Sequence, residues 1–370
     1  MKRIILFLCI SSLFALPRFS IEEGASCISC HVNPTGSGMR NDYGSNVYSL
    51  DELTMRKWIN KGDEDWDGYI SDHIQIGGEF RIQSFQGNVS EGTFPMQAEI
   101  YATADINKKA VLYIEASLDR DNMNNEYFVL FNKLPNKSWI KIGNSYPTYG
   151  LMIDDHTSFI KSGNKNSLYL LEPNLDNGFR QLFNPKYRKP LIIEGSTQLS
   201  DNLNLIVSIS QPPQPSNGSK KDKNLNTYNS SMNYSKNFNF GSLLIGTSFM
   251  KQDTISLVGI YGGLSFKDFT MTYEIDKADK LFNDHKDQTS LATYYQLVYK
   301  PIQGLHIITK YDFFDHDYEF ESGSVSRYSF GFELYPLNVL EIKIQARQYE
   351  IDNIDLNLDT EYLLQIHTWF

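Results

Sequence analysis

Three residues near the N-terminus, Cys27, Cys30 and His31, could carry redox chemistry. They form the pattern C-x-x-C-H, which is typical of covalent haem attachment. Each thiol would form a thioether bond with a haem vinyl group, and the adjacent imidazole would bind the iron from one side. The sequence therefore predicts one haem c, with Cys27 and Cys30 as its attachment points and His31 as the proximal iron ligand.

Two other uses of the cysteine pair remain open. A disulfide between Cys27 and Cys30 would close a very short loop, and short loops stabilise a chain little. A zinc ion would require four ligands, and no second pair of cysteine or histidine residues lies near the motif. The histidine that follows the second cysteine, together with the export signal described below, favours haem over both.

The motif does not determine the distal ligand of the iron. Met39 follows a glycine-containing turn soon after the motif, and His73 lies on the polar side of the first predicted strand. These two are the preferred candidates, and a methionine would raise the reduction potential relative to a second histidine. Three further candidates remain: Met55, Met152 and His156.

The first residues have the organisation of an export signal. Lys2 and Arg3 form a basic start, and the apolar run that follows, residues 4–16, is too short to span a bilayer. Residues 1–15 are therefore predicted to be a signal peptide. Its removal would take Cys9 away and leave the two cysteines of the motif.

The composition excludes several classes of protein. With 34 Lys and Arg against 44 Asp and Glu, the chain is acidic and offers no cationic face for nucleic acid. A mean hydropathy of −0.38 is too low for a bundle of membrane-spanning helices. An aromatic content of 14% with 24 glycines suits a β-rich chain, above all a membrane-embedded barrel.

Most of the chain alternates between apolar and polar side chains with the period of a β-strand, as in residues 74–83 and 340–347. Many such stretches have about ten residues, the length that crosses a bilayer when the strand is tilted. For residues 71–370 we predict an all-β fold, a transmembrane antiparallel outer-membrane β-barrel of about sixteen strands. The aromatic C-terminus, Phe370, resembles the signal by which the barrel assembly machinery places such proteins in outer-membrane lipid.

Residues 16–70 precede the barrel and are too few to enclose a large hydrophobic core. At residues 49–52 the pattern S-x-x-E matches a capping box and predicts that a short helix begins there, with Leu50 and Leu53 on its apolar face. We interpret this segment as the cytochrome c-like part of the chain.

Inside the predicted barrel, one stretch alternates poorly and contains several helix- and strand-breaking residues, residues 146–190. We predict a long connection there that folds into the lumen. On strand phase His306 and His367 also face inward, where we expect them to be solvated.

The residues around the motif bring a specific resemblance. Pro17, Phe19, Gly24 and Cys27 form the pattern P-x-F-x-x-x-x-G-x-x-C, which runs into C-x-x-C-H. In this the chain resembles the fused monohaem cytochrome–porin proteins of iron-oxidising bacteria. The resemblance implies a small N-terminal cytochrome segment that acts as a plug in an outer-membrane barrel of a Gram-negative cell. It also implies that electrons pass from extracellular Fe(II) to periplasmic carriers.

We therefore expect electron transfer across the outer membrane. The partners would be an extracellular metal or small redox carrier on one side and a periplasmic c-type cytochrome or other redox carrier on the other. Whether the chain is an Fe(II)-oxidising enzyme stays open. One alternative is a diffusion porin whose haem-bearing plug is structural or regulatory, and another is a soluble periplasmic cytochrome with a β domain.

Overall fold

The computed structural model describes residues 17–55, 68–87, 91–107, 109–118, 125–155, 157–161, 187–212, 214–215, 224–281, 288–319, 323–352 and 360–370. The predicted signal peptide lies outside the described residues.

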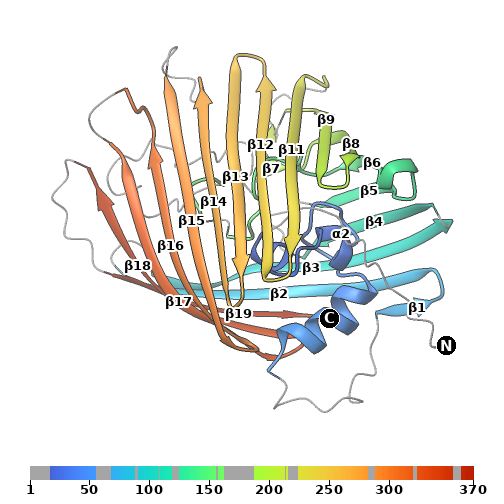
Figure 1. The fold of residues 1–370 in the computed structure, drawn as a ribbon, viewed down its shortest axis with the longest axis horizontal. Coiled ribbons are helices and arrows are strands. Elements are labelled where there is room, and N and C mark those ends of the chain that lie inside the picture. Colours follow the sequence, from blue (N-terminus) through green and yellow to red (C-terminus); the bar gives the residue numbers. More distant parts are fainter. Residues whose placement is uncertain are drawn as a thin grey trace.

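Sixteen antiparallel strands of the described chain close into one barrel (Figure 1). They are β2 (Ile74–Gln86), β3 (Gly92–Asn107), β4 (Ala110–Ser117), β5 (Glu126–Phe131), β6 (Trp139–Asn144), β8 (Leu191–Ser200), β9 (Leu203–Ser210), β11 (Thr227–Phe238), β12 (Gly241–Gln252), β13 (Ile255–Phe266), β14 (Phe269–Asp279), β15 (Thr289–Ile302), β16 (Leu305–Asp315), β17 (Val325–Leu337), β18 (Leu340–Ile351) and β19 (Glu361–Trp369). Neighbours in the barrel are also neighbours along the chain, and β19 closes it against β2, with Tyr362 opposite Gln86 and Trp369 opposite Glu79. The predicted all-β barrel of about sixteen strands is confirmed.

Within the residues that the structure describes, the elements outside the barrel wall are short. They are α1 (Pro17–Glu23), α2 (Cys27–Cys30), the π-helix η1 (Tyr43–Leu53), the 3-10 turn η3 (Pro135–Lys137), and the strands β1 (Tyr69–Ser71), β7 (Tyr187–Arg188) and β10 (Gln214–Pro215). The strand β1 pairs with β2, and β7 pairs with β10 in a separate two-stranded sheet. None of the helices in the described residues is long and apolar enough to cross a membrane.

The barrel wall carries its apolar side chains outside and its polar side chains inside. Along β15, Tyr295, Leu297 and Tyr299 face outward and are 37–44% exposed, whereas Gln296 between them is 9% exposed. The same holds for charged residues of the neighbouring strands that face the lumen and are buried there: Lys310, Asp312, Arg327, Glu333 and Glu341. An apolar exterior around a polar interior is the pattern of a barrel whose outer wall faces lipid, and it disagrees with a soluble β domain.

The two rims of the barrel differ in the length of their connections. At one rim the strands are joined by tight turns such as residues 239–240 and 338–339, and we call this the short-turn rim. At the other rim most of the connections are longer, for example residues 211–226 and 316–324, although β12 and β13 are joined there by residues 253–254. In outer-membrane barrels the short turns lie on the periplasmic side and the long loops outside the cell.

The long connection between β6 and β8 folds into the lumen, as the sequence predicts, over the part that the structure describes, residues 145–155 and 157–161. The Gly150 amide donates a hydrogen bond to the Ser248 hydroxyl at 2.9 Å, and the Leu151 amide donates to the Glu274 carboxylate at 2.6 Å. Both acceptors belong to inward-facing positions of the wall, on β12 and β14. We call residues 145–155 and 157–161 the inserted segment.

The helix predicted to begin at residues 49–52 is placed differently. Those residues lie inside the π-helix η1, which ends at Leu53. The Ser49 hydroxyl donates to the Gly44 carbonyl at 2.8 Å within the same helix, so it cannot cap a helix start. Leu53 is buried, as predicted, and packs with Tyr48 against the barrel.

The alternating faces of β15 predict that two adjacent substitutions lower the free energy of unfolding by different amounts. Leu297→Arg would place a guanidinium on the outward face near the middle of the strand, which costs about 2–4 kcal/mol in a bilayer. Gln296→Arg would point into the lumen and should cost clearly less. Urea unfolding of the protein in lipid vesicles measures both. A larger loss of unfolding free energy for Gln296→Arg would contradict the assigned faces.

Candidate functional site

The cysteine–histidine motif forms one helical turn inside the barrel. The backbone amide of His31 donates a hydrogen bond to the Cys27 carbonyl at 2.7 Å and so closes α2. Cys27 is 7% exposed and Cys30 is partly buried, and the two are not joined by a disulfide. The turn therefore presents the three side chains of the motif from one short piece of backbone.

Asn41 braces this turn from the chain that follows it. Its backbone amide donates to the Cys30 carbonyl at 2.9 Å, and its side-chain amide donates to the carbonyls of Ile28 and Ser29 at 3.0 and 3.1 Å. Gly44 completes the brace, because a Cβ at this position would lie 2.1 Å from the Cys30 carbonyl oxygen. The sequence does not predict that Asn41 supports the motif, because such a set of hydrogen bonds has no spacing pattern of its own.

A cavity of about 610 Å³ inside the barrel is lined by Cys27, Cys30 and His31. The barrel wall contributes mainly polar and charged side chains to it, and the inserted segment contributes Met152 and Asp154. The cavity thus lies between three parts of the chain that are far apart in sequence. They are the wall, the inserted segment and residues 17–55, which we call the N-terminal segment.

The environment of His31 keeps its imidazole neutral. Burial, together with the positive charge of Arg40, lowers the pKa of His31 to about 4. A neutral imidazole is the form that binds iron. The neutral ring, the two thiols on the same helical turn and the cavity beside them fit a haem c group held by Cys27, Cys30 and His31.

The two thiols are also shaped by burial. Burial raises the pKa of Cys27 well above that of an ordinary thiol and raises the pKa of Cys30 to about 11. Both side chains therefore stay protonated at neutral pH when they carry no other group. A protonated thiol is a weak nucleophile and a poor metal ligand, so this environment does not favour a thiolate-bound metal ion.

The structure separates the candidates for the distal ligand. Met39 is 3% exposed and packs against aromatic and aliphatic side chains of the barrel wall, and it is not among the described residues that line the cavity. His73 is exposed in the turn between β1 and β2 rather than within a strand. Met55 lies against Gly304 at the short-turn rim. Met152 lines the cavity, and His156 lies outside the described residues.

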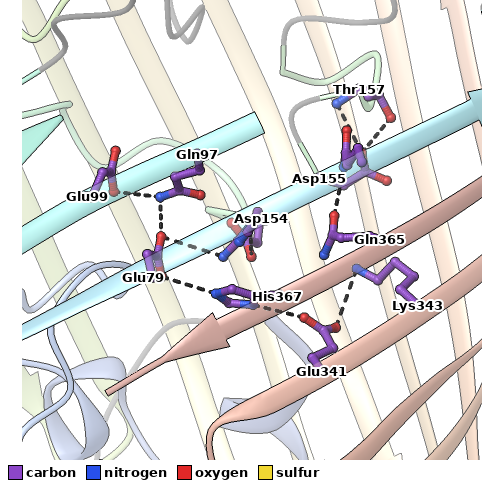
Figure 2. Close-up of polar contacts among 12 residues, drawn as sticks. Glu79, Gln97, Glu99, Asp154, Asp155, Thr157, Glu341, Lys343, Gln365 and His367 are labelled. Carbon is purple, nitrogen blue, oxygen red and sulfur yellow. Dashed lines mark hydrogen bonds and ion pairs between the residues drawn. The ribbon is translucent and has the colours of Figure 1, made fainter. Parts of the chain in front are cut away.

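The sequence predicts a solvated His367, but this prediction is wrong. The ring is buried and connects two carboxylates of the wall (Figure 2). Its ring nitrogens lie 3.0 Å from Glu341 and 3.4 Å from Glu79. Arg81 continues this chain of charges, with its guanidinium 3.8 Å from Glu79 and 2.7 Å from Asp154 of the inserted segment. The inserted segment is thereby held to β2 by a buried cation.

His306 is likewise buried rather than solvated. Its ring centroid lies 5.8 Å from that of Phe19 and 5.3 Å from that of Tyr335. Phe19 belongs to α1, so the N-terminal segment fills the space that water would otherwise occupy. Beside these rings Arg18 donates to the Tyr335 hydroxyl at 2.7 Å and forms an ion pair with Glu333.

Further contacts join the N-terminal segment to the short-turn rim. Lys300 forms an ion pair with Glu22 at 2.6 Å. The side chain of Gln303, which lies in the turn between β15 and β16, donates to the carbonyls of Asp51 and Thr54 at 2.8 and 2.7 Å. The N-terminal segment is thus bound at the same end of the barrel where the strands are joined by tight turns.

Comparison with solved structures shows the class of fold. The outer-membrane channel DcaP of Acinetobacter baumannii superposes with a TM-score of 0.55 and 11% identity, over 82% of this chain and 99% of that one. OprB of Pseudomonas putida at high pH gives 0.54 and 10%, over 80% and 94%. A refined porin structure gives 0.51 and 10%, over 80% and 100%. No family model matches the sequence, and no curated protein matches it.

The chain therefore has the fold of the outer-membrane porins, a closed antiparallel barrel of sixteen strands. At about 10% identity this likeness concerns the fold alone. The cysteine–histidine motif inside the barrel is a feature of this chain, and any function proposed for the chain has to account for it.

The contacts of α1 predict which ion pair holds the N-terminal segment. Arg18→Ala would break a buried pair with Glu333, which keeps Lys343 as a partner at 2.9 Å. The cost should therefore lie below the about 3–5 kcal/mol of a buried charge left without any partner, and above that of an exposed pair. Lys300→Ala, the control, would break the more exposed pair with Glu22 and cost about 0–1 kcal/mol. Hydrogen exchange of the amides in residues 17–55 measures both. Equal protection in the two variants would show that the segment is not held through Arg18.

Proposed function

We propose that the chain is a fused monohaem cytochrome–porin of the outer membrane, which moves electrons between an extracellular donor or acceptor and periplasmic cytochromes. One observation carries the proposal: a complete haem-attachment motif lines the cavity of a porin-like barrel. Cys27 and Cys30 would hold one haem c covalently, and His31 would be the proximal ligand of its iron. The bound haem would supply one-electron chemistry.

The chain's own residues would hold this group and keep water away from it. Cys27 belongs to an apolar cluster that includes Ile21 of α1 and Tyr149, Leu151 and Ile153 of the inserted segment. Apolar surroundings disfavour added charge and tune the reduction potential of a haem. The neutral imidazole of His31 is available to the iron without first losing a proton.

The position of the N-terminal segment supports a direction for the partners. The segment is bound at the short-turn rim, which is the periplasmic rim in outer-membrane barrels. A periplasmic c-type cytochrome or other redox carrier would approach from that side. One haem cannot bridge a hydrocarbon core of about 30 Å alone. The extracellular partner, a metal ion such as Fe(II) or a small redox carrier, would therefore have to enter the lumen.

A diffusion porin is the second candidate, and the likeness in fold to channel proteins favours it. In that case the N-terminal segment would be a structural or regulatory plug. Conductance in planar bilayers separates the two functions. A steady pore whose conductance does not change when the haem is reduced would favour the diffusion porin.

The proposal predicts a covalently bound haem. Wild-type protein purified from outer membranes, made in cells with working haem-attachment machinery, should give the pyridine haemochrome spectrum of one c-type haem per chain. The double variant Cys27→Ala/Cys30→Ala should give none, because both thioether bonds are lost. Heat modifiability on gels checks that both proteins are folded barrels.

The outcomes of this experiment are distinct. A c-type spectrum that the double variant lacks supports a cytochrome in a barrel, and the reduction of that haem by Fe(II) or small carriers can then be measured. A folded wild-type barrel without haem would remove the electron-transfer function and leave the diffusion porin.

A further inference from the structure

We propose that Met152, in the inserted segment, is the distal ligand of the haem iron. This inference rests on the proposed function, because it requires a haem at the cysteine–histidine motif. The inserted segment would then supply a ligand of the redox centre. Neither the cysteine–histidine motif nor the porin fold implies such a role for it. Four observations carry it.

The first observation is shared access to one cavity. Among the candidates for the distal ligand that the structure describes, Met152 is the one that lines the cavity with His31. His367 also lines the cavity, but its two ring nitrogens lie beside the carboxylates of Glu341 and Glu79. Met152 is partly buried and packs against the apolar cluster that contains Cys27.

The second observation is that the inserted segment is anchored at this cavity. Asp154, two residues after Met152, lines the cavity together with His31. Arg81 of β2 fixes the carboxylate of Asp154 with an ion pair of 2.7 Å. The backbone that follows Met152 is therefore held to the wall at the cavity that His31 lines.

The third observation is the local backbone. The Ile153 amide donates to the Leu151 carbonyl at 2.8 Å, which makes Met152 the central residue of a three-residue turn. The Leu151 amide is itself anchored to Glu274 of the wall at 2.6 Å. The side chain at the centre of such a turn projects from a backbone that is fixed on both sides.

The fourth observation is the chemistry of the sulfur. The one polar contact that the structure gives it within the described residues is the ammonium of Lys161, at 3.8 Å. A thioether is a weak hydrogen-bond acceptor and keeps its second lone pair for a soft metal centre. Methionine opposite histidine is the axial pair of high-potential cytochromes c.

One other methionine has to be distinguished from Met152. Met96 also lines the cavity, at the irregularity in the pairing of β3 with β2, where Arg81 is opposite Gln97 and Ile82 is opposite Pro95. Met96 does not belong to the cluster of Cys27. It serves as the matched control, because its thioether reaches the same cavity from the wall.

The test compares Met152→Leu and Met96→Leu with the wild-type holoprotein. Leucine keeps the volume of methionine and removes the sulfur ligand, so the barrel should remain folded. Ferric wild-type protein should show the red charge-transfer band of a sulfur–iron bond, and the ferrous protein should show strongly shifted methionine methyl resonances. Met152→Leu should lose both signals and have a lower midpoint potential, whereas Met96→Leu should keep them.

A further variant, Met152→His, should convert the spectrum to that of two histidine ligands and lower the potential as well. The inference is overturned if Met152→Leu keeps the sulfur signals, if Met96→Leu or Met39→Leu loses them, or if the wild-type haem shows none. Any of these results leaves the proposed function standing, because the haem is still attached. A wild-type barrel without haem would overturn both.

Discussion

In hydrocarbon, a backbone amide or carbonyl can bond only to another part of the chain, and a sheet that crosses a membrane must therefore have no free edge. The closure of β19 on β2 meets this constraint. It also fixes what lies inside. Because the strands alternate, an outer wall of Leu297 and its neighbours forces an inner wall of polar and charged groups. The elements inside the barrel supply hydrogen-bond and ion-pair partners to some of these inner groups.

Several inner charges are paired with each other across the wall, as in Arg327 with Asp312, and others are paired by segments that are not part of the wall. Arg18 of α1 binds Glu333, and Asp154 and Asp155 of the inserted segment bind Arg81 and Lys310, the latter at 2.8 Å. A buried ion whose partner is removed costs several kcal/mol, roughly 3–5 by analogy with other proteins. Ion pairs with the wall thus hold both α1 and the inserted segment in the lumen. The cavity at His31 is the space that remains between these two segments.

The sequence predicted the features that follow from local patterns. Period-two alternation determined the barrel and the number of its strands, and the motif determined which three side chains meet in the cavity. These local patterns could not predict contacts between residues that are far apart in the sequence. The brace by Asn41, the burial of His306 behind Phe19 and the links of His367 to Glu79 and Glu341 depend on chain folding back into the lumen. The same holds for residues 49–52, where a π-helix replaced the predicted helix start.

The seam between β2 and β19 has a consequence for biogenesis. Its two strands lie at opposite ends of the barrel sequence, so the wall cannot close before the last residues have been exported, and Phe370 then pairs with Gly78 through two backbone hydrogen bonds of 3.1 and 3.2 Å. The closed wall surrounds Cys27, which is buried. Under the proposed function, an enzyme that joins haem to this thiol would have to act before the wall encloses it. Maturation of the N-terminal segment would then precede closure of the barrel.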